Sequence, residues 1–203
     1  MKLYYSPGAC SLSPHIVARE LDLPIELIKV DGRAKKTADG ADFLQINPKG
    51  YVPALALDDG EVLTEGPAIV QYLADQRPDR GLAPANGTLP RYRLQETLGF
   101  INSELHKTYS PLFTPGTAPE VRDERIAYLR RRYATIEQQL AGKSYLFGDQ
   151  FTVADAYLFV VTGWANFLKL DLSEFPNLMA FQARVAGRPA VREALIAEGL
   201  AKA

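Results

Sequence analysis

The sequence has few residues of the types that form covalent or metal cross-links. Its 203 residues include a single cysteine, Cys10, and two histidines. One cysteine excludes an internal disulfide and any metal site with two thiolate ligands, so we expect no bound metal. The chemistry of Cys10 must therefore be considered by itself. A chain without disulfides is typical of a reducing compartment, which favours a cytoplasmic location.

The sequence also lacks a strong net charge and a long apolar run. Its 23 Lys and Arg residues nearly balance 24 Asp and Glu residues, giving a formal net charge of −1. This balance provides no basic field for nucleic acid or an anionic membrane surface. No stretch resembles a signal peptide, and no run reaches the ~18 apolar residues of a membrane span. We expect neither nucleic acid nor a membrane as a partner.

The composition, with 47% hydrophobic and 23% charged residues, is that of a folded globular protein. Its length suggests two small domains. Residues 78–90 contain three prolines and two glycines, the pattern of a linker. We therefore predict an N-terminal domain over 1–77, a linker over 78–89 and a second domain over 90–203.

The sequence predicts an α+β fold for the first domain. Short apolar runs at 2–6 and 25–30 flank a helical pattern, which predicts a βαβ unit. Two further runs, 53–57 and 61–64, are joined by an Asp-Asp-Gly turn and predict a hairpin. A helix follows over 67–75. Together these segments predict a mixed four-stranded sheet with helices packed on it.

Beyond the linker the pattern is helical throughout. A stripe of four apolar residues predicts a helix with one buried face; its members are Leu94, Leu98, Ile101 and Leu105. Further helices are predicted over 120–140, 152–168, 175–186 and 189–198. The helix over 152–168 begins with Thr152, and Asp155 follows three residues later, which is a capping pattern. The long apolar run of this helix predicts a central position in the domain.

Cys10 lies where a strand ends, a Pro-Gly turn follows and a helix begins with Ser11 or Ser13 as its cap. Unsatisfied amides of a helix's first turn favour a thiolate. Lowering a thiol pKa by ~2 units requires about 2.7 kcal/mol, more than the ~0.3–2 kcal/mol that a helix terminus supplies. A cation or a hydroxyl, with Ser11 nearest, must therefore contribute. The alternative is a buried structural cysteine.

Two other places carry candidate polar groups. His106 lies on a helix face about 130° from the apolar stripe, together with Gly99, Ser103 and Ser110, and Lys107 follows it in sequence. His106 and Lys107 form either a donor pair for a sulfur or carboxylate, or two solvent-facing residues, and spacing alone favours the second alternative. Glu65 precedes a Gly-Pro helix start that could hold an amino-acid end of a ligand, or is an ordinary first-turn acid.

Four segments together resemble one known family, and the last of them contains the Thr152–Asp155 capping pattern. They are NPKGYVPAL (47–55), LTEGPAIVQYLAD (63–75), ELHKTYSPLF (104–113) and FTVADAYLF (151–159). The whole chain resembles a bacterial beta-class glutathione S-transferase. The resemblance implies a thioredoxin-like N-terminal domain, an all-helical C-terminal domain, a homodimer and glutathione as co-substrate.

The resemblance also assigns roles to individual residues. Cys10 would face the glutathione sulfur and form a mixed disulfide with it, in the company of Ser11, His106 and Lys107. The remaining glutathione contacts would come from Lys35 at the glycyl carboxylate, Val52 before a cis Pro53 at the cysteinyl backbone, and Glu65 with Gly66 at the γ-glutamyl end. The X-Pro isomer itself cannot be decided from sequence.

One position departs from the family pattern. Where related sequences often have an asparagine that reaches the neighbouring subunit's glutathione, this chain has Gly99. We expect weaker γ-glutamyl binding, or compensation by Asn102. Gly66 likewise offers only a backbone amide where a serine hydroxyl could bind.

The leading hypothesis is a glutathione transferase that joins the thiolate to a small hydrophobic electrophile, with thiol transferase or peroxidase side activity. Tyr109, Phe113 and Trp164 are candidate walls of the electrophile cleft, or core residues. Two alternatives stay open: a non-catalytic binding or interaction module with this fold, and a glutathione-dependent reductive dehalogenase.

Overall fold

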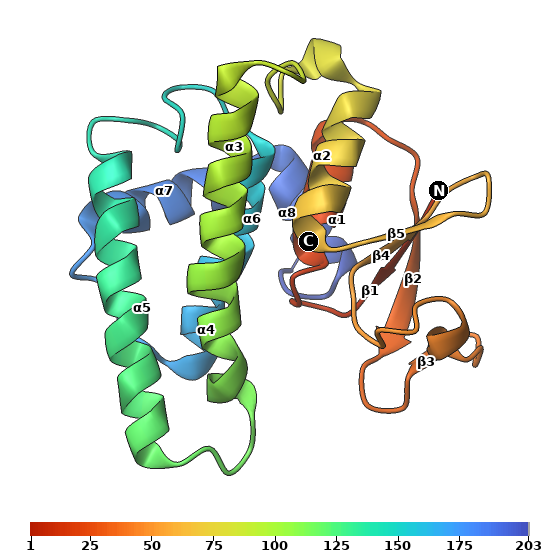
Figure 1. The fold of residues 1–203 in the computed structure, drawn as a ribbon, viewed down its shortest axis with the longest axis horizontal. Coiled ribbons are helices and arrows are strands. Elements are labelled where there is room, and N and C mark those ends of the chain that lie inside the picture. Colours follow the sequence, from red (N-terminus) through yellow and green to blue (C-terminus); the bar gives the residue numbers. More distant parts are fainter. Residues whose placement is uncertain (203) are drawn as a thin grey trace. The chain divides into compact units, whose positions relative to one another are not determined.

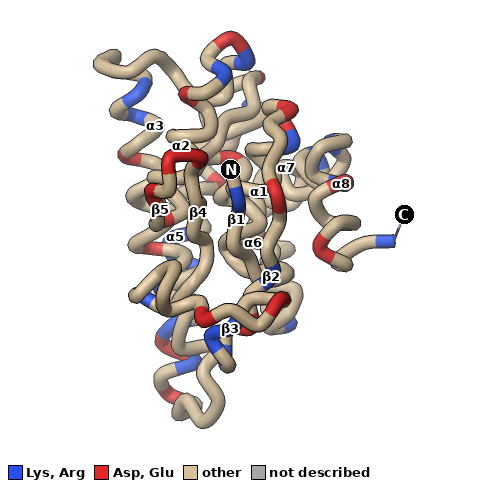
Figure 2. Tube along the Cα trace, turned by 90° about the vertical axis from the view of Figure 1, so that its right-hand side faces the viewer, with Lys and Arg blue, Asp and Glu red and all other residues tan. Residues whose placement is uncertain are grey.

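The computed structural model describes residues 1–202, whose contacts group into two units (Figure 1). The first unit joins Met1–Ala83 to the C-terminal segment that begins at Gly187. The second comprises Pro84–Ala186. Basic and acidic residues are interspersed along the described chain in Figure 2. Within residues 1–202, no helix combines the length and apolarity needed to cross a bilayer.

The first unit is built on a mixed sheet of five strands in the order β3-β2-β1-β4-β5. The strands are β1 (Lys2–Tyr5), β2 (Glu26–Asp31), β3 (Lys36–Thr37), β4 (Ala54–Ala56) and β5 (Val62–Thr64). Only β1 and β2 are parallel, connected through α1 (Leu12–Glu20). This arrangement confirms the thioredoxin-like α+β fold. The predicted sheet had four strands; β3 was missed because two residues are too few to show an alternation.

The predicted hairpin and the helix that follows it are both present in the first unit. β4 and β5 pair antiparallel, and Gly60 between them has φ 92°, a value that glycine adopts without strain. Helix α2 (Gly66–Gln76) buries Ile69 and Leu73 completely, and α1 packs against it. In Figure 1, α1, α2 and α8 lie on the same side of the sheet.

The last helix differs from the expectation that residues 90–203 form one domain. Helix α8 (Pro189–Ala197) packs on α1 and is part of the first unit. Val191 and Ala194 are fully buried, and Arg188 Nε lies 2.6 Å from Glu20 Oε1. The apolar spacing of α8 indicates that one face is buried, but it carries no information about the partner.

The second unit is helical, as predicted. Its α-helices are α3 (Leu89–Phe100), α4 (Lys107–Tyr109), α5 (Pro119–Leu140), α6 (Val153–Leu168) and α7 (Pro176–Ala186). A short 3₁₀ segment, η4 (Ser110–Phe113), follows α4, and two others, η1 (Phe43–Gln45) and η2 (Pro78–Arg80), belong to the first unit. All four residues of the predicted stripe are at most 1% exposed. Helix α6 contacts both α3 and α7, which confirms its central position.

The predicted helix around residues 94–105 is not a single α-helix. After α3, residues Ile101–His106 form a π-helical segment, η3. Its wider turn changes the angle between successive side chains, so the polar face predicted from α-helical spacing does not continue. Ser103 is exposed, whereas His106 is half-buried beside Tyr157 and Trp164. The expectation that His106 faces away from the helical core is therefore wrong.

The start of α6 is fixed by Asp155. Its buried carboxylate accepts hydrogen bonds from the Thr152 amide at 2.8 Å, the Thr152 hydroxyl at 2.7 Å and the Leu146 amide at 2.8 Å. Burial raises the pKa of Asp155 to about 6, against the effect of these bonds. Asp155 thus ties the α5–α6 connection to the helix it begins.

Candidate functional site

Cys10 lies in the turn between β1 and α1, and its thiol is partly buried. The Sγ atom is 3.4 Å from the Val52 carbonyl oxygen, in a hydrogen bond that the thiol donates. The first-turn amides of α1 are not all unsatisfied, contrary to expectation: the Leu12 amide donates to Ala9 and the Ser13 amide to Cys10. The turn continues helix-like bonding towards the N-terminus, so these two amides are not free to contact a thiolate.

Ser11 is completely buried and acts on the backbone of its own loop. Its hydroxyl accepts from the Ser6 amide and donates to the Ser6 carbonyl, both at 3.2 Å. Ser11 occupies the N-cap position of α1 but makes no capping bond, while the Ser13 hydroxyl donates to the Cys10 carbonyl at 2.8 Å. These contacts hold the loop that presents Cys10.

The segment preceding β4 lies beside Cys10. The Val52–Pro53 peptide bond is cis, which answers the question the sequence left open. Pro53 is buried and Val52 is half-buried. The Val52 backbone is thus placed next to the thiol.

Glu65 and Gly66 lie at the start of α2, where Glu65 has φ 68°. The Glu65 Oε1 atom accepts from Lys49 Nζ and from the Tyr51 hydroxyl, both at 2.8 Å. The hydrogen bond to Glu65 raises the pKa of both Lys49 and Tyr51. Neither Lys49 nor Tyr51 was among the predicted site residues, although both lie in the NPKGYVPAL segment.

Lys35, which directly precedes β3, also contacts the NPKGYVPAL segment. Its Nζ donates to the Gly50 carbonyl at 2.6 Å. Gly50 has φ 70°, and a Cβ there would lie 3.1 Å from Leu44 Cδ2, so a larger residue would strain this approach. Residues 49–53 therefore contact three candidates from separate parts of the chain, namely Lys35, Glu65 and Cys10.

His106 is held by aromatic neighbours in the second unit. Its Nδ1 is 2.6 Å from the Tyr157 hydroxyl, and its ring lies edge-on to Trp164 with centroids 4.8 Å apart. The Tyr157 hydroxyl also donates to Asn102 Oδ1 at 2.9 Å, so Asn102 has a contact within its own unit. Lys107 is exposed at the start of α4. That His106 and Lys107 approach Cys10 stays a prediction.

The three candidate cleft residues form one aromatic cluster. The Trp164 ring centroid lies 5.6 Å from that of Tyr109 and 5.9 Å from that of Phe113, both edge-on. Phe113 is 48% exposed, whereas Tyr109 is fully buried. The Tyr109 hydroxyl lies 2.9 Å from that of Tyr133, and burial raises the pKa of both phenols.

The two glycines that depart from the family pattern, Gly99 and Gly66, both leave room for a side chain. A Cβ added at Gly99 would meet no described atom within 4 Å, so a side chain has room there. A Cβ at Gly66 would lie 3.9 Å from Pro53, an ordinary contact. Among residues 1–202, no group of three His, Cys, Asp or Glu side chains is arranged to hold a metal.

Comparisons with known proteins agree with this arrangement. The family described as "Glutathione S-transferase, N-terminal domain" matches residues 8–76, and "Glutathione S-transferase, C-terminal domain" matches residues 100–189. The glutathione S-transferase GstA of Escherichia coli O157:H7 is 46% identical over 98% of this chain and all of that protein.

Two solved structures extend the likeness to the whole fold. A bacterial beta-class glutathione S-transferase from Sphingomonas chungbukensis is 49% identical, with a TM-score of 0.96 over 99% of this chain and 100% of its own. A sphingomonad glutathione S-transferase complexed with glutathione is 50% identical, with a TM-score of 0.95 over the same shares. The chain therefore belongs to the glutathione S-transferase family, within the beta class.

Proposed function

We propose that the chain is a glutathione transferase that binds glutathione in its first unit, along residues 49–53, with the sulfur at Cys10. The observation that supports this most strongly is the convergence of Lys35, Glu65 and Cys10 on that one segment. Glutathione carries a carboxylate at its glycyl end, a thiol, and an ammonium at its γ-glutamyl end. The Lys35 ammonium suits the glycyl carboxylate, Cys10 suits the thiol, and the Glu65 carboxylate suits the γ-glutamyl ammonium.

The conjugation reaction needs the tripeptide's thiolate. The thiol loses its proton to solvent, and the sulfur forms a bond to an electrophilic carbon while the leaving group departs with its electron pair. Ser11, His106 and Lys107 are proposed to stabilise the negative sulfur. The contact with Tyr157 fixes the orientation of the His106 ring for that role.

Cys10 is proposed to support thiol–disulfide exchange as well. Its thiolate attacks the glutathione sulfur of a disulfide between glutathione and another small thiol, forming a Cys10–glutathione mixed disulfide and releasing the other thiol as its thiolate. A second glutathione thiolate then attacks the mixed disulfide, regenerating Cys10 and glutathione disulfide. One protein thiol is enough for this cycle, and Cys10 is the only cysteine in the chain.

The aromatic cluster of Tyr109, Phe113 and Trp164 is proposed as a wall for the second substrate. Its rings are apolar, and Phe113 is half exposed. Edge-to-face aromatic contacts favour a small, flat, hydrophobic electrophile. The homodimer and the cytoplasmic location belong to the same proposal, on the strength of the resemblance.

Calorimetric titration with glutathione tests the binding mode. We expect Glu65→Gln and Lys35→Met each to weaken binding about tenfold, because each removes a charge-assisted hydrogen bond. Glu61→Gln and Lys36→Met are matched controls, since both residues are exposed, Lys36 next to Lys35 and Glu61 just before β5. Equal affinity in all four variants would show that the peptide binds elsewhere.

A further inference from the structure

The hydroxyl of Tyr157 contacts two side chains of the π-helical segment η3. Tyr157 lies in the first half of α6 and is 1% exposed. Its oxygen is 2.6 Å from His106 Nδ1 and 2.9 Å from Asn102 Oδ1. All three residues belong to the second unit. The amide of Asn102, the phenol of Tyr157 and the imidazole of His106 therefore form one chain of hydrogen bonds.

The direction of this chain follows from the number of protons in it. A phenol has one proton and an amide oxygen can only accept, so the Tyr157 proton is donated to Asn102 Oδ1. The phenol oxygen then presents a lone pair to His106 Nδ1. A lone pair on Nδ1 at 2.6 Å would repel it, so Nδ1 carries a proton and donates it to Tyr157. Because a neutral imidazole has one N–H group, its lone pair is on Nε2.

The aromatic neighbours of His106 keep its two ring nitrogens in place. The ring lies edge-on to Tyr157 and to Trp164, with centroid distances of 5.9 and 4.8 Å. Half a turn of the imidazole would bring a carbon atom to the phenol oxygen in place of Nδ1 and would break the hydrogen bond. The orientation of the ring is therefore fixed together with the position of its proton.

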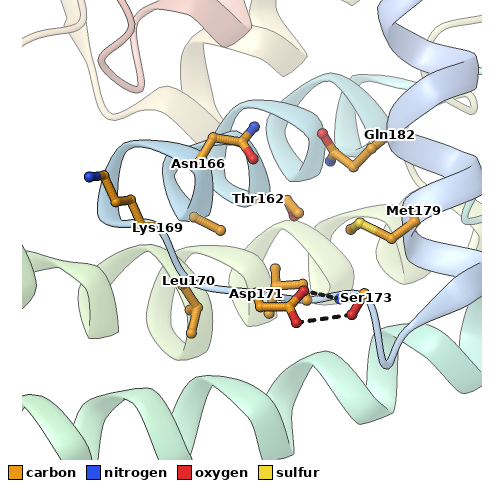
Figure 3. A pocket seen from close by; sticks show the side chains of 10 residues that line it. Thr162, Asn166, Lys169, Leu170, Asp171, Ser173, Met179 and Gln182 are labelled. Atoms are coloured by element: carbon orange, nitrogen blue, oxygen red, sulfur yellow. Dashed lines mark hydrogen bonds between the residues drawn. The ribbon is translucent and has the colours of Figure 1, made fainter.

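The C-terminal half of α6 has a different environment. Figure 3 shows Asn166 beside a hollow between α6 and α7, with Gln182 on the side of α7. Gln182 Nε2 donates to the Phe159 carbonyl at 3.4 Å, so this amide has a partner within the protein. The polar contact of α6 that bears on His106 is in the first half of the helix, at Tyr157.

We propose that Tyr157 and Asn102 are positioning residues that hold neutral His106 with its proton on Nδ1 and its lone pair on Nε2. This inference rests on the proposed function, in which His106 lies beside the glutathione sulfur. The proton that the thiol gives up passes to Nε2, which leaves a thiolate beside an imidazolium. After the sulfur has bonded to the electrophile and the leaving group has departed with its electron pair, Nε2 releases the proton to solvent.

NMR of the imidazole nitrogens in the full chain without glutathione tests the position of the proton. A ring nitrogen that carries a proton and one that carries a lone pair differ in ¹⁵N shift. The chain has two histidines, so the signals lost in His106→Gln are those of His106. Well above the ordinary imidazole pKa of ~6.5, we expect the proton on Nδ1. A proton on Nε2, or on both nitrogens, would overturn the proposal.

Two substitutions of Asn102 test the direction of the chain. Asn102→Ala removes the acceptor, so the Tyr157 proton can turn to His106 Nδ1, and we expect the imidazole proton to shift from Nδ1 to Nε2. Asn102→Asp keeps an oxygen that only accepts and should keep the proton on Nδ1, which a merely structural role of Asn102 does not predict. Asn166→Ala is the matched control and should change nothing. A proton that stays on Nδ1 in Asn102→Ala would overturn the proposal.

Kinetics with glutathione and an aryl halide test the consequence for the reaction. Tyr157→Phe keeps the ring and removes the hydroxyl, and we expect kcat to fall roughly tenfold while KM for glutathione changes less than about twofold. Tyr133→Phe, which removes another buried hydroxyl, is the matched control with unchanged kcat. Equal kcat in both variants would overturn the role of Tyr157.

The two proposals fail in different ways. Absence of glutathione binding, with the His106 proton found on Nδ1, would refute the proposed function and with it the proton transfer from the thiol. Conjugation of glutathione by a chain whose His106 proton is on Nε2 would refute this inference alone.

Discussion

Lys49 occupies the position where the ammonium of a γ-glutamyl group is proposed to bind. Its Nζ lies 2.8 Å from Glu65 Oε1 and 2.9 Å from Thr64 Oγ1. A ligand ammonium must therefore share Glu65 with Lys49. We expect Lys49→Met to tighten glutathione binding about two- to fivefold at low salt, and less at high salt because both groups are exposed.

Calorimetry at two salt concentrations measures this effect, with Lys36→Met as the control at another exposed lysine. Weaker binding by Lys49→Met would contradict the idea of competition and would show instead that Lys49 orders Glu65 for the ligand.

At the residue scale, the sequence was enough to predict which residues could form the site, but not which of them contact one another. Lys35 was chosen through the family resemblance alone, whereas Glu65 was also indicated by its place before a helix start. The distance between these residues along the chain does not predict that both contact residues 49–53. The pairing of Lys49 with Glu65 spans 16 positions and depends on how the strands are ordered. Such a contact follows from tertiary structure alone.

At the scale of elements, the α6 start depends on Asp155. Asp155→Ala leaves three donors, two amides and a hydroxyl, without their acceptor in the interior. We expect the free energy of unfolding to fall by roughly 2–4 kcal/mol. Urea unfolding measures it, and Asp149→Ala, an exposed acid on the same connection, is the control.

The same carboxyl makes stability depend on pH. Its pKa is about 6 in the folded chain and near ~4 when unfolded, so between these values only the folded chain holds the proton. The contribution of Asp155 to stability is therefore present below pH ~4 and is lost as the pH rises through about 6. Comparing wild type with Asp155→Asn across this window isolates the effect. The opposite slope would show that the three hydrogen bonds outweigh burial.

The attachment of α8 to α1 is also testable. Just beyond α8, Glu198 accepts from His15 at 2.9 Å and from the Gly8 amide at 2.9 Å. Glu198→Ala should cost roughly 2–4 kcal/mol, because it leaves the buried His15 ring and the half-buried Gly8 amide without their acceptor. Thermal unfolding with Glu193→Ala as the exposed control checks this. Equal stability of the two variants would mean that α8 is held without Glu198, by its apolar packing and by the Arg188–Glu20 ion pair.

At the scale of the whole molecule, an exposed apolar pair supports the proposed homodimer. Leu89 is 68% exposed and Tyr92, one turn later on α3, is 59% exposed. Neighbouring exposed apolar residues often mark an interface between subunits. We expect sedimentation velocity to show a dimer, and Tyr92→Asp to increase the monomer fraction. A wild-type monomer at micromolar concentration would refute the dimer.

The sequence predicts much of the fold because periodicity marks buried faces. The stripe of Leu94, Leu98, Ile101 and Leu105 is buried as expected. What periodicity does not encode is the partner of each face or a local change in helix type. Periodicity therefore could not predict the π-helical segment that ends at His106 or the packing of α8 on α1.

The grouping of α8 with the first unit affects how the protein is made. The ribosome must add residues 84–186 before α8 can reach α1. At about 5–20 residues per second, this delay is on the order of 5–20 s. During that time α1 lacks the helix that packs on it in the finished chain, so chaperones have their longest opportunity to bind that face of α1 before synthesis ends.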